Sequence, residues 1–389
     1  MALAPVYGHE DVRSVLVAAV RADKDKKGLA QSLLMHGPAG IGKQRVGLWL
    51  AQQVMCESPA PDGLACGRCQ SCRMVTRLEH PDVHWFFPLP RPDAATPEKL
   101  RDKLEEARGA ELAARRADPF HVPAYDRAPA YFMGTIQNLQ RFASVRPAMG
   151  SRKVFLVGDA EAMVPQESSP EAANAFLKLL EEPPADTTLI LTSSNPGALL
   201  PTIRSRVLPV RLLPLPTEQV AAFMEREKGM PRADAERIAA VSAGSIGKAL
   251  RLLPGAGGAG VLQRQRDAGR ALLQAATSAS ASDRLAAANA VAPAGARGEF
   301  TGTLEALSLW LRDLMAVAAG AADSLAYTDD VALLQGIVSR GRVEAGSVAS
   351  ALMRVQEARD LASGNVNPQL IVADLLRGIR QDVGPHPAA

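Results

Sequence analysis

Apolar residues in the first half of the chain come in short runs that have the length of buried strands. There are three such runs: residues 31–36, 153–157 and 188–192. Residues 43–54, between the first two runs, instead repeat their apolar residues at helical spacing. Strands separated by helices are typical of a parallel sheet with crossover connections. We therefore predict an α/β domain over residues 1–213.

The strand pattern stops after this domain. Residues 217–253 indicate three short helices, with breaks at Gly229 and at Gly244. We interpret residues 214–253 as a small helical lid on the α/β domain.

A Gly-rich linker, residues 254–260, precedes a third region whose pattern is helical throughout. Four leucines there recur at helical spacing: Leu304, Leu307, Leu311 and Leu314. A final helix is expected to begin at Asn367-Pro368, where asparagine caps it. Residues 261–389 are thus predicted to form a helical domain of their own.

Residues 88–129 read as an insertion into the α/β domain. They hold a charged helix that begins at Thr96-Pro97, an N-cap followed by proline at the first helical position. Leu100, Leu104 and Ala107 give it only a narrow apolar stripe, which favours a peripheral, solvated surface helix.

The composition is that of an ordinary water-soluble chain. Among 389 residues, 47% are hydrophobic and 22% are charged, and the net charge is +3. An aromatic content of 4% argues against a platform for stacking bases, and near-neutrality argues neither for nor against a nucleic-acid partner. The N-terminus shows no signal pattern and no 18-residue uncharged apolar run occurs, so we expect a cytoplasmic protein without a membrane partner.

All four cysteines lie within one short stretch: Cys56, Cys66, Cys69 and Cys72. Nine residues separate the first two and two residues separate each later pair, so tight turns bring the thiols together. Four thiolates favour tetrahedral Zn²⁺, and a site with no open position is structural. The alternatives are unrelated buried cysteines, a redox pair, or an iron–sulfur cluster.

A phosphate-binding loop is nearly complete after the first strand. Gly37, Gly40 and Gly42 supply the flexible backbone and Lys43 the cation, but Gln44 stands where a Mg²⁺-binding Ser or Thr belongs. We do not expect Mg²⁺ here. Binding of ATP without the metal stays open from the sequence.

The end of the second predicted strand lacks the acidic pair of a hydrolysing enzyme. Gly158 stands where the Mg²⁺-holding Asp belongs, and Asp159 where the water-polarising Glu belongs. In the other register Glu161 is one position too far along, and alternation of strand faces predicts that its carboxylate points away. Gln44 and Gly158 read as two independent losses.

Three further motifs resemble the clamp-loader branch of the AAA+ family. They are the helix motif at residues 173–184, the segment at 188–196 and the Thr-Ile-Arg-Ser-Arg-Val run at 202–207. The similarity covers roughly 300 residues and extends to the cysteine module, to residues 244–250 and to the final helix. It implies a P-loop AAA+ domain with a zinc module (56–72), a lid and a collar domain that packs with neighbouring subunits.

The resemblance assigns Arg206 as an arginine finger that reaches the ATP of the neighbouring subunit. Guanidinium suits this role because it stays charged and offers a planar fork to phosphate oxygens. Val207 replaces the cysteine that usually follows. Without the resemblance, Arg204 and Arg206 would read as solvated loop arginines.

The resemblance also implies two nucleotide sensors. Ser193 or Ser194 matches the first, and the sequence does not choose between them. The second sensor is usually an arginine at the position of Gly247, so it reads as lost, and Lys248 does not replace its fork.

These observations favour a non-hydrolysing clamp-loader subunit of a replicative DNA polymerase holoenzyme. Its expected partners are motor and delta-like subunits in a hetero-pentamer, the sliding clamp indirectly, and primed DNA within the complex. One rival is an ATP-hydrolysing AAA+ motor subunit, which requires the substitutions at Gln44, Gly158 and Gly247 to be tolerated. Another is a zinc-dependent nucleic-acid-binding module, against which the near-neutral charge argues.

Overall fold

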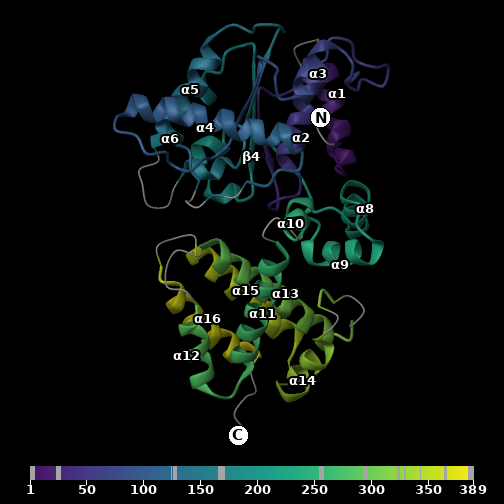
Figure 1. Cartoon of the computed structure of the whole chain (residues 1–389), viewed down its shortest axis with the longest axis vertical. Coiled ribbons are helices and arrows are strands. Elements are labelled where there is room, and N and C mark those ends of the chain that lie inside the picture. Colours follow the sequence, from purple (N-terminus) through teal and green to yellow (C-terminus); the bar gives the residue numbers. More distant parts are fainter. Residues whose placement is uncertain are drawn as a thin grey trace. The chain divides into compact units, whose positions relative to one another are not determined.

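A computed structural model of the chain describes residues 5–22, 28–123, 125, 129–164, 171–253, 258–291, 297–321, 325–327, 330–341, 343–362 and 366–383 (Figure 1). These residues belong to two compact units. The first comprises Met1–Gly229 and Ala243–Leu250, and the second comprises Met230–Ser242 and Arg251–Ala389.

The described part of the first unit holds a five-stranded sheet in the order β2-β3-β4-β1-β5, and all of its strand pairs are parallel. The strands are β1 (Ser32–His36), β2 (Val83–Phe86), β3 (Lys153–Val157), β4 (Thr187–Ser193) and β5 (Leu208–Arg211). The three central strands are the predicted ones. The edge strands β2 and β5 were not predicted. The predicted fold class, a parallel α/β domain followed by helical regions, is confirmed.

Helices cover both faces of this sheet. They are α1 (Glu10–Ala22), α2 (Lys43–Met55), α3 (Gln70–Thr76), α4 (Pro97–Ala117), α5 (Met133–Ser144), α6 (Glu171–Glu181), α7 (Pro201–Arg204), α8 (Thr217–Lys228) and α10 (Ile246–Arg251), with 3₁₀ turns η2 (Ala160–Met163) and η3 (Pro196–Ala198). Successive side chains of a strand point to opposite faces. Leu34 and Phe155 accordingly pack in a core with α5 and α6, whereas Leu33 and Val154 pack in a second core with α1 and α2.

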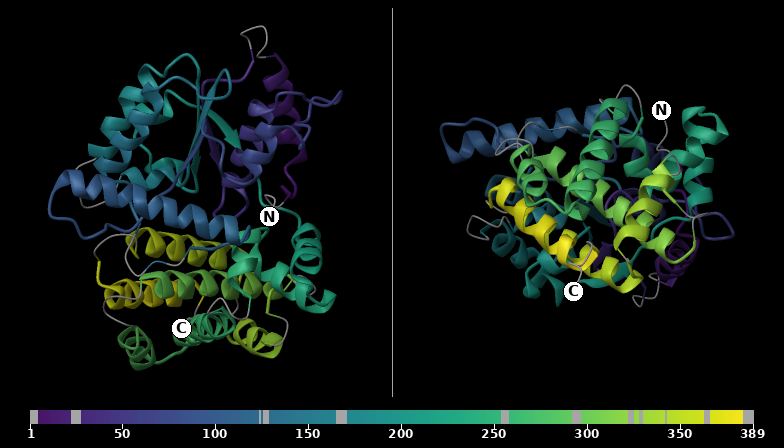
Figure 2. Two further views of the ribbon diagram at one scale, coloured as in Figure 1. Left: turned by 45° about the horizontal axis from the view of Figure 1, so that its top comes forward. Right: turned by 90° about the horizontal axis from the view of Figure 1, so that it is seen from below.

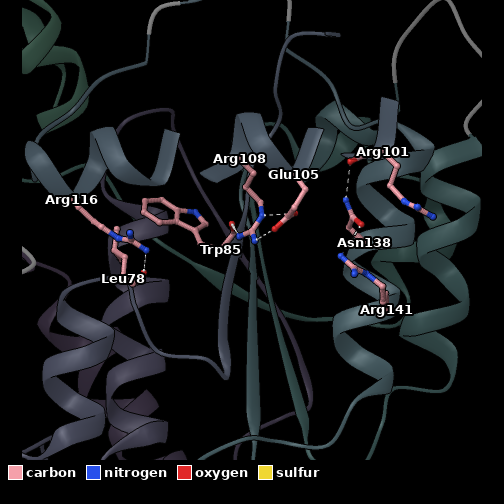
Figure 3. Close-up of polar contacts among 8 residues, drawn as sticks. All are labelled: Leu78, Trp85, Arg101, Glu105, Arg108, Arg116, Asn138 and Arg141. Carbon is pink, nitrogen blue, oxygen red and sulfur yellow. Dashed lines mark hydrogen bonds and ion pairs between the residues drawn. The ribbon is translucent and has the colours of Figure 1, made fainter. Parts of the chain in front are cut away.

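The insertion helix α4 is the surface helix that its narrow apolar stripe predicted, but it also packs against the edge of the sheet. Its side chain Leu104 is 1% exposed, and the helix lies across the edge strand β2. Figure 3 shows Arg108 donating from Nη1 to the Trp85 carbonyl oxygen (3.2 Å) and Arg116 donating from Nη2 to the Leu78 carbonyl oxygen (2.7 Å). The contacts are made largely by arginine, so apolar periodicity underestimates them. The predicted start is confirmed, because the Thr96 side chain accepts from the Lys99 N–H.

The chain beyond α4 packs against the rest of the first unit through Phe120. The Phe223 ring of α8 lies between the Tyr7 and Phe120 rings, with centroid distances of 4.9 Å and 5.1 Å and edge-to-face geometry in both pairs. The Lys228 ammonium and the Arg45 guanidinium lie over the Phe120 ring. The insertion is therefore tied to both α2 and α8.

The described part of the second unit is helical (Figure 2, green to yellow). Its helices are α9 (Arg232–Ser242), α11 (Gly258–Thr277), α12 (Ala281–Asn289), α13 (Arg297–Ala318), α14 (Val331–Gly341), α15 (Ala345–Ala362) and α16 (Pro368–Val383). The four leucines predicted to line one helix are fully buried in α13. Asn367 accepts from the Gln369 N–H at the start of α16, as its capping role requires.

The structure bears on two further predictions, the length of the Gly-rich linker and the absence of membrane-spanning segments. Helix α11 begins at Gly258, so the Gly-rich linker is shorter than predicted, and residues 254–257 lie outside the described residues. Across the described part of the chain, no helix combines the length and apolarity needed to span a membrane.

Candidate functional site

The carboxyl ends of three neighbouring strands meet at one edge of the sheet. The near-complete phosphate-binding loop follows β1, Asp159 follows β3 and Ser194 follows β4. Ligands of open parallel sheets bind at this edge, so the geometry brings the predicted pocket residues together.

The loop backbone has the shape that its glycines allow. Gly37, Gly40 and Gly42 have positive φ angles of 149°, 74° and 101°. At Gly37 a Cβ atom would lie 2.2 Å from the Leu212 carbonyl oxygen. The loop therefore passes too close to the residue that follows β5 for any side chain at position 37.

The Lys43 ammonium group binds acceptors within its own chain. The side chain is buried, and its Nζ donates to the Gly37 and Pro38 carbonyl oxygens (2.9 and 2.7 Å) and to Ser194 Oγ (2.9 Å). Three acceptors match the three N–H groups of an ammonium. Burial lowers the pKa of Lys43, and the nearby Asp159 and Glu161 oppose that shift. These bonds also identify Ser194 as the serine that faces the loop.

Gln44 is held on both sides of its amide. Its Nε2 donates to Asp159 Oδ2, and Trp85 Nε1 donates to its Oε1, each at 3.0 Å. A Cβ atom on Gly158 would lie 2.7 Å from the Gln44 amide atoms. The two departures from the motif are therefore in contact, and the expectation that they are independent is wrong.

The expectation that Glu161 points away from the site is also wrong. Asp159 has a φ of 48°, and a 3₁₀ turn replaces the strand directly after it, so alternation of strand faces no longer applies. Glu161 Oε1 instead accepts from the Ser194 N–H (2.8 Å), and its Oε2 is buried without a hydrogen-bond partner among the described residues. Burial and the Glu161 charge raise the pKa of Asp159.

The segment 243–250 closes directly onto the loop. The Gly247 N–H donates to the Gly40 carbonyl oxygen (2.8 Å), and Ser245 Oγ donates to the Ala39 carbonyl oxygen (2.9 Å). A Cβ atom on Gly247 would lie 2.9 Å from Gly40 Cα. A sensor arginine at position 247 would therefore have to push these backbones apart.

Arg206 lies after α7 and is exposed. Its Nη1 donates to the Thr202 carbonyl oxygen (2.9 Å) and to Ser205 Oγ (3.3 Å), and its Nη2 donates to Glu181 Oε1 (2.8 Å). Among the described residues, none of its hydrogen bonds goes to the phosphate-binding loop. The structure thus does not bring Arg206 into this chain's own pocket.

The four cysteine sulfurs lie within 4.8 Å of one another, and none forms a disulfide. A tetrahedral ion with Zn–S bonds of about 2.3 Å needs S···S distances of roughly 3.8 Å, so the cluster fits such an ion. Backbone N–H groups of Cys66, Cys69 and Cys72 donate to sulfurs of the cluster at 3.2 to 3.4 Å, which favours thiolates.

Helix α2 holds the cysteine loop in place. Gln52 donates to the Cys72 carbonyl oxygen (3.3 Å), and Gln53 Oε1 accepts from the Ala65 N–H (2.6 Å). The cysteine cluster and the glycine-rich loop after β1 thus share one supporting helix.

Sequence reasoning missed two contributors to the site. Trp85 holds the Gln44 amide, and the buried Tyr131 donates from its hydroxyl to the Gly158 carbonyl oxygen at 2.6 Å. Both residues flank the insertion along the chain, and no local motif marks them. The pairing of β2 with β3 brings Trp85 toward the end of β3, and a hydrogen bond from the Tyr131 N–H to the Ala162 carbonyl oxygen holds Tyr131 there.

A parallel α/β fold with a glycine-rich loop, a buried lysine and a polar strand end at one edge defines a P-loop protein. Residues 11–216 match the family model described as DNA polymerase III, delta subunit. That match covers more than half of the chain, and the chain belongs to this family.

Curated relatives agree with this assignment. The chain is 34% identical over 227 residues to the DNA polymerase III subunit delta' of Pseudomonas aeruginosa, a match that covers 57% of this chain and 56% of the relative. It is 27% identical over 240 residues to the subunit delta' of Escherichia coli, covering 62% and 58%. The chain thus spans somewhat over half the length of these relatives. The resemblance that the sequence motifs predict is confirmed.

A solved structure of a DNA polymerase III gamma subunit-related protein from Thermotoga maritima is 15% identical and aligns over 94% of this chain and 99% of that one, with a TM-score of 0.40. The assignment of the fold does not depend on this alignment, because the sheet order and the loop define it.

Proposed function

We propose that the chain is a non-hydrolysing subunit of the clamp loader of a replicative DNA polymerase. In this role it supplies Arg206 to ATP that a neighbouring motor subunit holds. One observation carries the proposal: Gln44, at the position of the Mg²⁺-binding hydroxyl, has its amide bonded to Asp159 and Trp85, whereas Arg206 lies exposed and outside its own pocket.

The pocket residues support the absence of hydrolysis. Gln44 offers no hydroxyl for Mg²⁺, and its amide is already bonded to Asp159 and Trp85. Nucleotide binding would require Lys43 to exchange its internal acceptors for phosphate oxygens, and Gly247 to leave Gly40. The rival, an ATP-hydrolysing motor subunit, requires both changes.

The proposed partners are motor and delta-like subunits in a hetero-pentamer that acts on the sliding clamp and primed DNA in the cytoplasm. In the proposed domain division, residues 1–213 form the AAA+ domain, 214–253 the lid and 261–389 the collar that packs with neighbouring subunits. The helical second unit supports the collar assignment. We assign structural Zn²⁺ to the cluster of Cys56, Cys66, Cys69 and Cys72, which would then rigidify the lobe after α2.

Reconstitution with the motor subunits tests the proposal. Arg206→Ala is expected to abolish clamp- and DNA-stimulated hydrolysis at the site that Arg206 serves, since a finger is worth roughly 10³- to 10⁵-fold in turnover. Arg204→Ala, at the last position of α7, is the matched control. Unchanged hydrolysis with Arg206→Ala would contradict the trans role. ATP turnover by the purified chain alone, on the order of 1 s⁻¹, would favour the motor subunit instead.

A further inference from the structure

The exposed Arg206 side chain is held in one orientation. Its three acceptors come from two places: Thr202 and Ser205 from α7 and its C-cap, and Glu181 from the last position of α6. Arg204 is exposed as well, but its guanidinium makes no hydrogen bond or ion pair with a described residue. Within the described part of the chain, Arg206 but not Arg204 is therefore oriented before any partner arrives.

The hydrogen bonds of Arg206 do not use all of the N–H groups of its guanidinium. A guanidinium has five N–H groups, and Arg206 uses one for each of its three acceptors, so the described residues leave two of them, on Nε and Nη2, without an acceptor. Two N–H groups are the number that bidentate binding of a phosphate needs. Glu181 accepts one N–H of the guanidinium and leaves others available to a phosphate.

Glu181 contributes to this arrangement more than it contributes to folding. The side chains of Arg206 and Glu181 are 36% and 48% exposed, and exposed ion pairs add little to stability. A long, flexible side chain loses less freedom on binding when it is already oriented. The Arg206–Glu181 ion pair is therefore expected to affect the binding of a ligand by Arg206 more than the stability of the fold.

We infer that Glu181 is a positioning residue that aims Arg206 at the phosphates of ATP held by a neighbouring subunit. This inference rests on the proposed function. The adjacent Glu182 is exposed as well but does not bind Arg206, so it offers a control at the same helix end and with the same charge.

The test compares Glu181→Gln, Glu182→Gln and Arg206→Ala in the clamp loader reconstituted with motor subunits, clamp and primed DNA. Glu181→Gln is expected to lower kcat and kcat/KM for ATP equally, by about 3- to 10-fold, because the finger acts in the transition state. Glu182→Gln should match the wild type, and Glu181→Asp should restore part of the loss. The melting temperature of the isolated Glu181→Gln chain should not change.

The outcomes separate this inference from the proposed function. Wild-type turnover with Glu181→Gln, while Arg206→Ala is impaired, overturns the positioning role and leaves the finger intact. Faster turnover with Glu181→Gln overturns it too, because the carboxylate would then restrain the arginine. If Arg206→Ala has no effect, the proposed function itself fails.

Discussion

Gly158 faces Gln44 so closely that a Cβ atom at position 158 would lie 2.7 Å from the Gln44 amide carbon, nitrogen and oxygen. The amide is anchored to Asp159 and Trp85, so it moves aside only by giving up both bonds. The two departures from a hydrolysing pocket are thus one steric arrangement. Restoring a carboxylate at position 158 alone would not restore the metal site.

We predict that Gly158→Ala lowers the free energy of unfolding by about 1–3 kcal/mol, the usual cost of overpacking a buried site. Gln44→Ser removes the atoms in conflict, so the double variant should be more stable than the sum of the single changes implies. Urea unfolding of the four chains completes a double-mutant cycle. Strict additivity would show that the two positions do not interact.

Removal of a cysteine ligand should unfold the lobe between α2 and β2. Cys69→Ser is expected to release one zinc ion per chain and to lower the stability of the first unit by several kcal/mol, because metal binding is folding free energy for such a site. Zinc content by mass spectrometry and thermal unfolding measure the two effects. Ser58→Ala, which alters a hydroxyl 3.8 Å from Cys66 Sγ, should keep the metal. A fully folded, zinc-free wild type would contradict this prediction.

Burial of His84 makes stability depend on pH. The ring stacks between Phe142 and Phe155, and burial, with Arg108 and Lys153 nearby, lowers its pKa from 6.5 to about 4. The unfolded chain therefore takes up this proton first as pH falls. The free energy of unfolding should decrease by up to about 3 kcal/mol between pH 6.5 and 4 and should show no contribution from His84 above pH 6.5.

His84→Phe isolates this contribution from those of the other titrating groups. Its stability should fall less than that of the wild type between pH 6.5 and 4, as measured by urea unfolding at a series of pH values. Parallel pH profiles of the two chains would show that His84 does not titrate abnormally.

The insertion should restrain α8 through Phe120. Phe120→Ala removes one of the two rings that flank Phe223, at a cost of roughly 1–3 kcal/mol to the local packing. Amide hydrogen exchange in α8 should become faster, while exchange in β3 and β4 stays as in the wild type. Phe132→Ala, at the start of α5, is the control and should leave α8 unchanged. Equal protection of α8 in wild type and Phe120→Ala would exclude the restraint.

The sequence predicts the parts of this fold in which local pattern and tertiary environment agree. The central strands are continuous apolar runs because both of their faces are buried. The edge strand β5 is largely exposed and contains Pro209, and β2 contains His84, so neither reads as a strand. Helix α4 was predicted from its cap, but its packing depends on arginine contacts that have no hydrophobic period.

The same division applies to the site. The loop glycines and Lys43 can be recognised from the sequence as a motif, because their spacing along the chain is fixed. The sequence does not predict the acceptors of Lys43, the partners of Gln44 or the direction of Glu161. These contacts depend on neighbouring strands and on the left-handed backbone conformation of Asp159. The contact of Arg206 with Glu181 likewise joins motifs 25 positions apart.

Each edge strand of the sheet lacks one backbone group that an incoming strand would need. On one side Arg108 occupies the Trp85 carbonyl of β2. On the other side the Leu212 N–H points inward to His36, so by alternation the position of Pro209 faces outward, where proline has no N–H to offer. A strand that approached either edge would therefore find the Trp85 carbonyl occupied or no N–H at position 209, which disfavours polymerisation through the sheet.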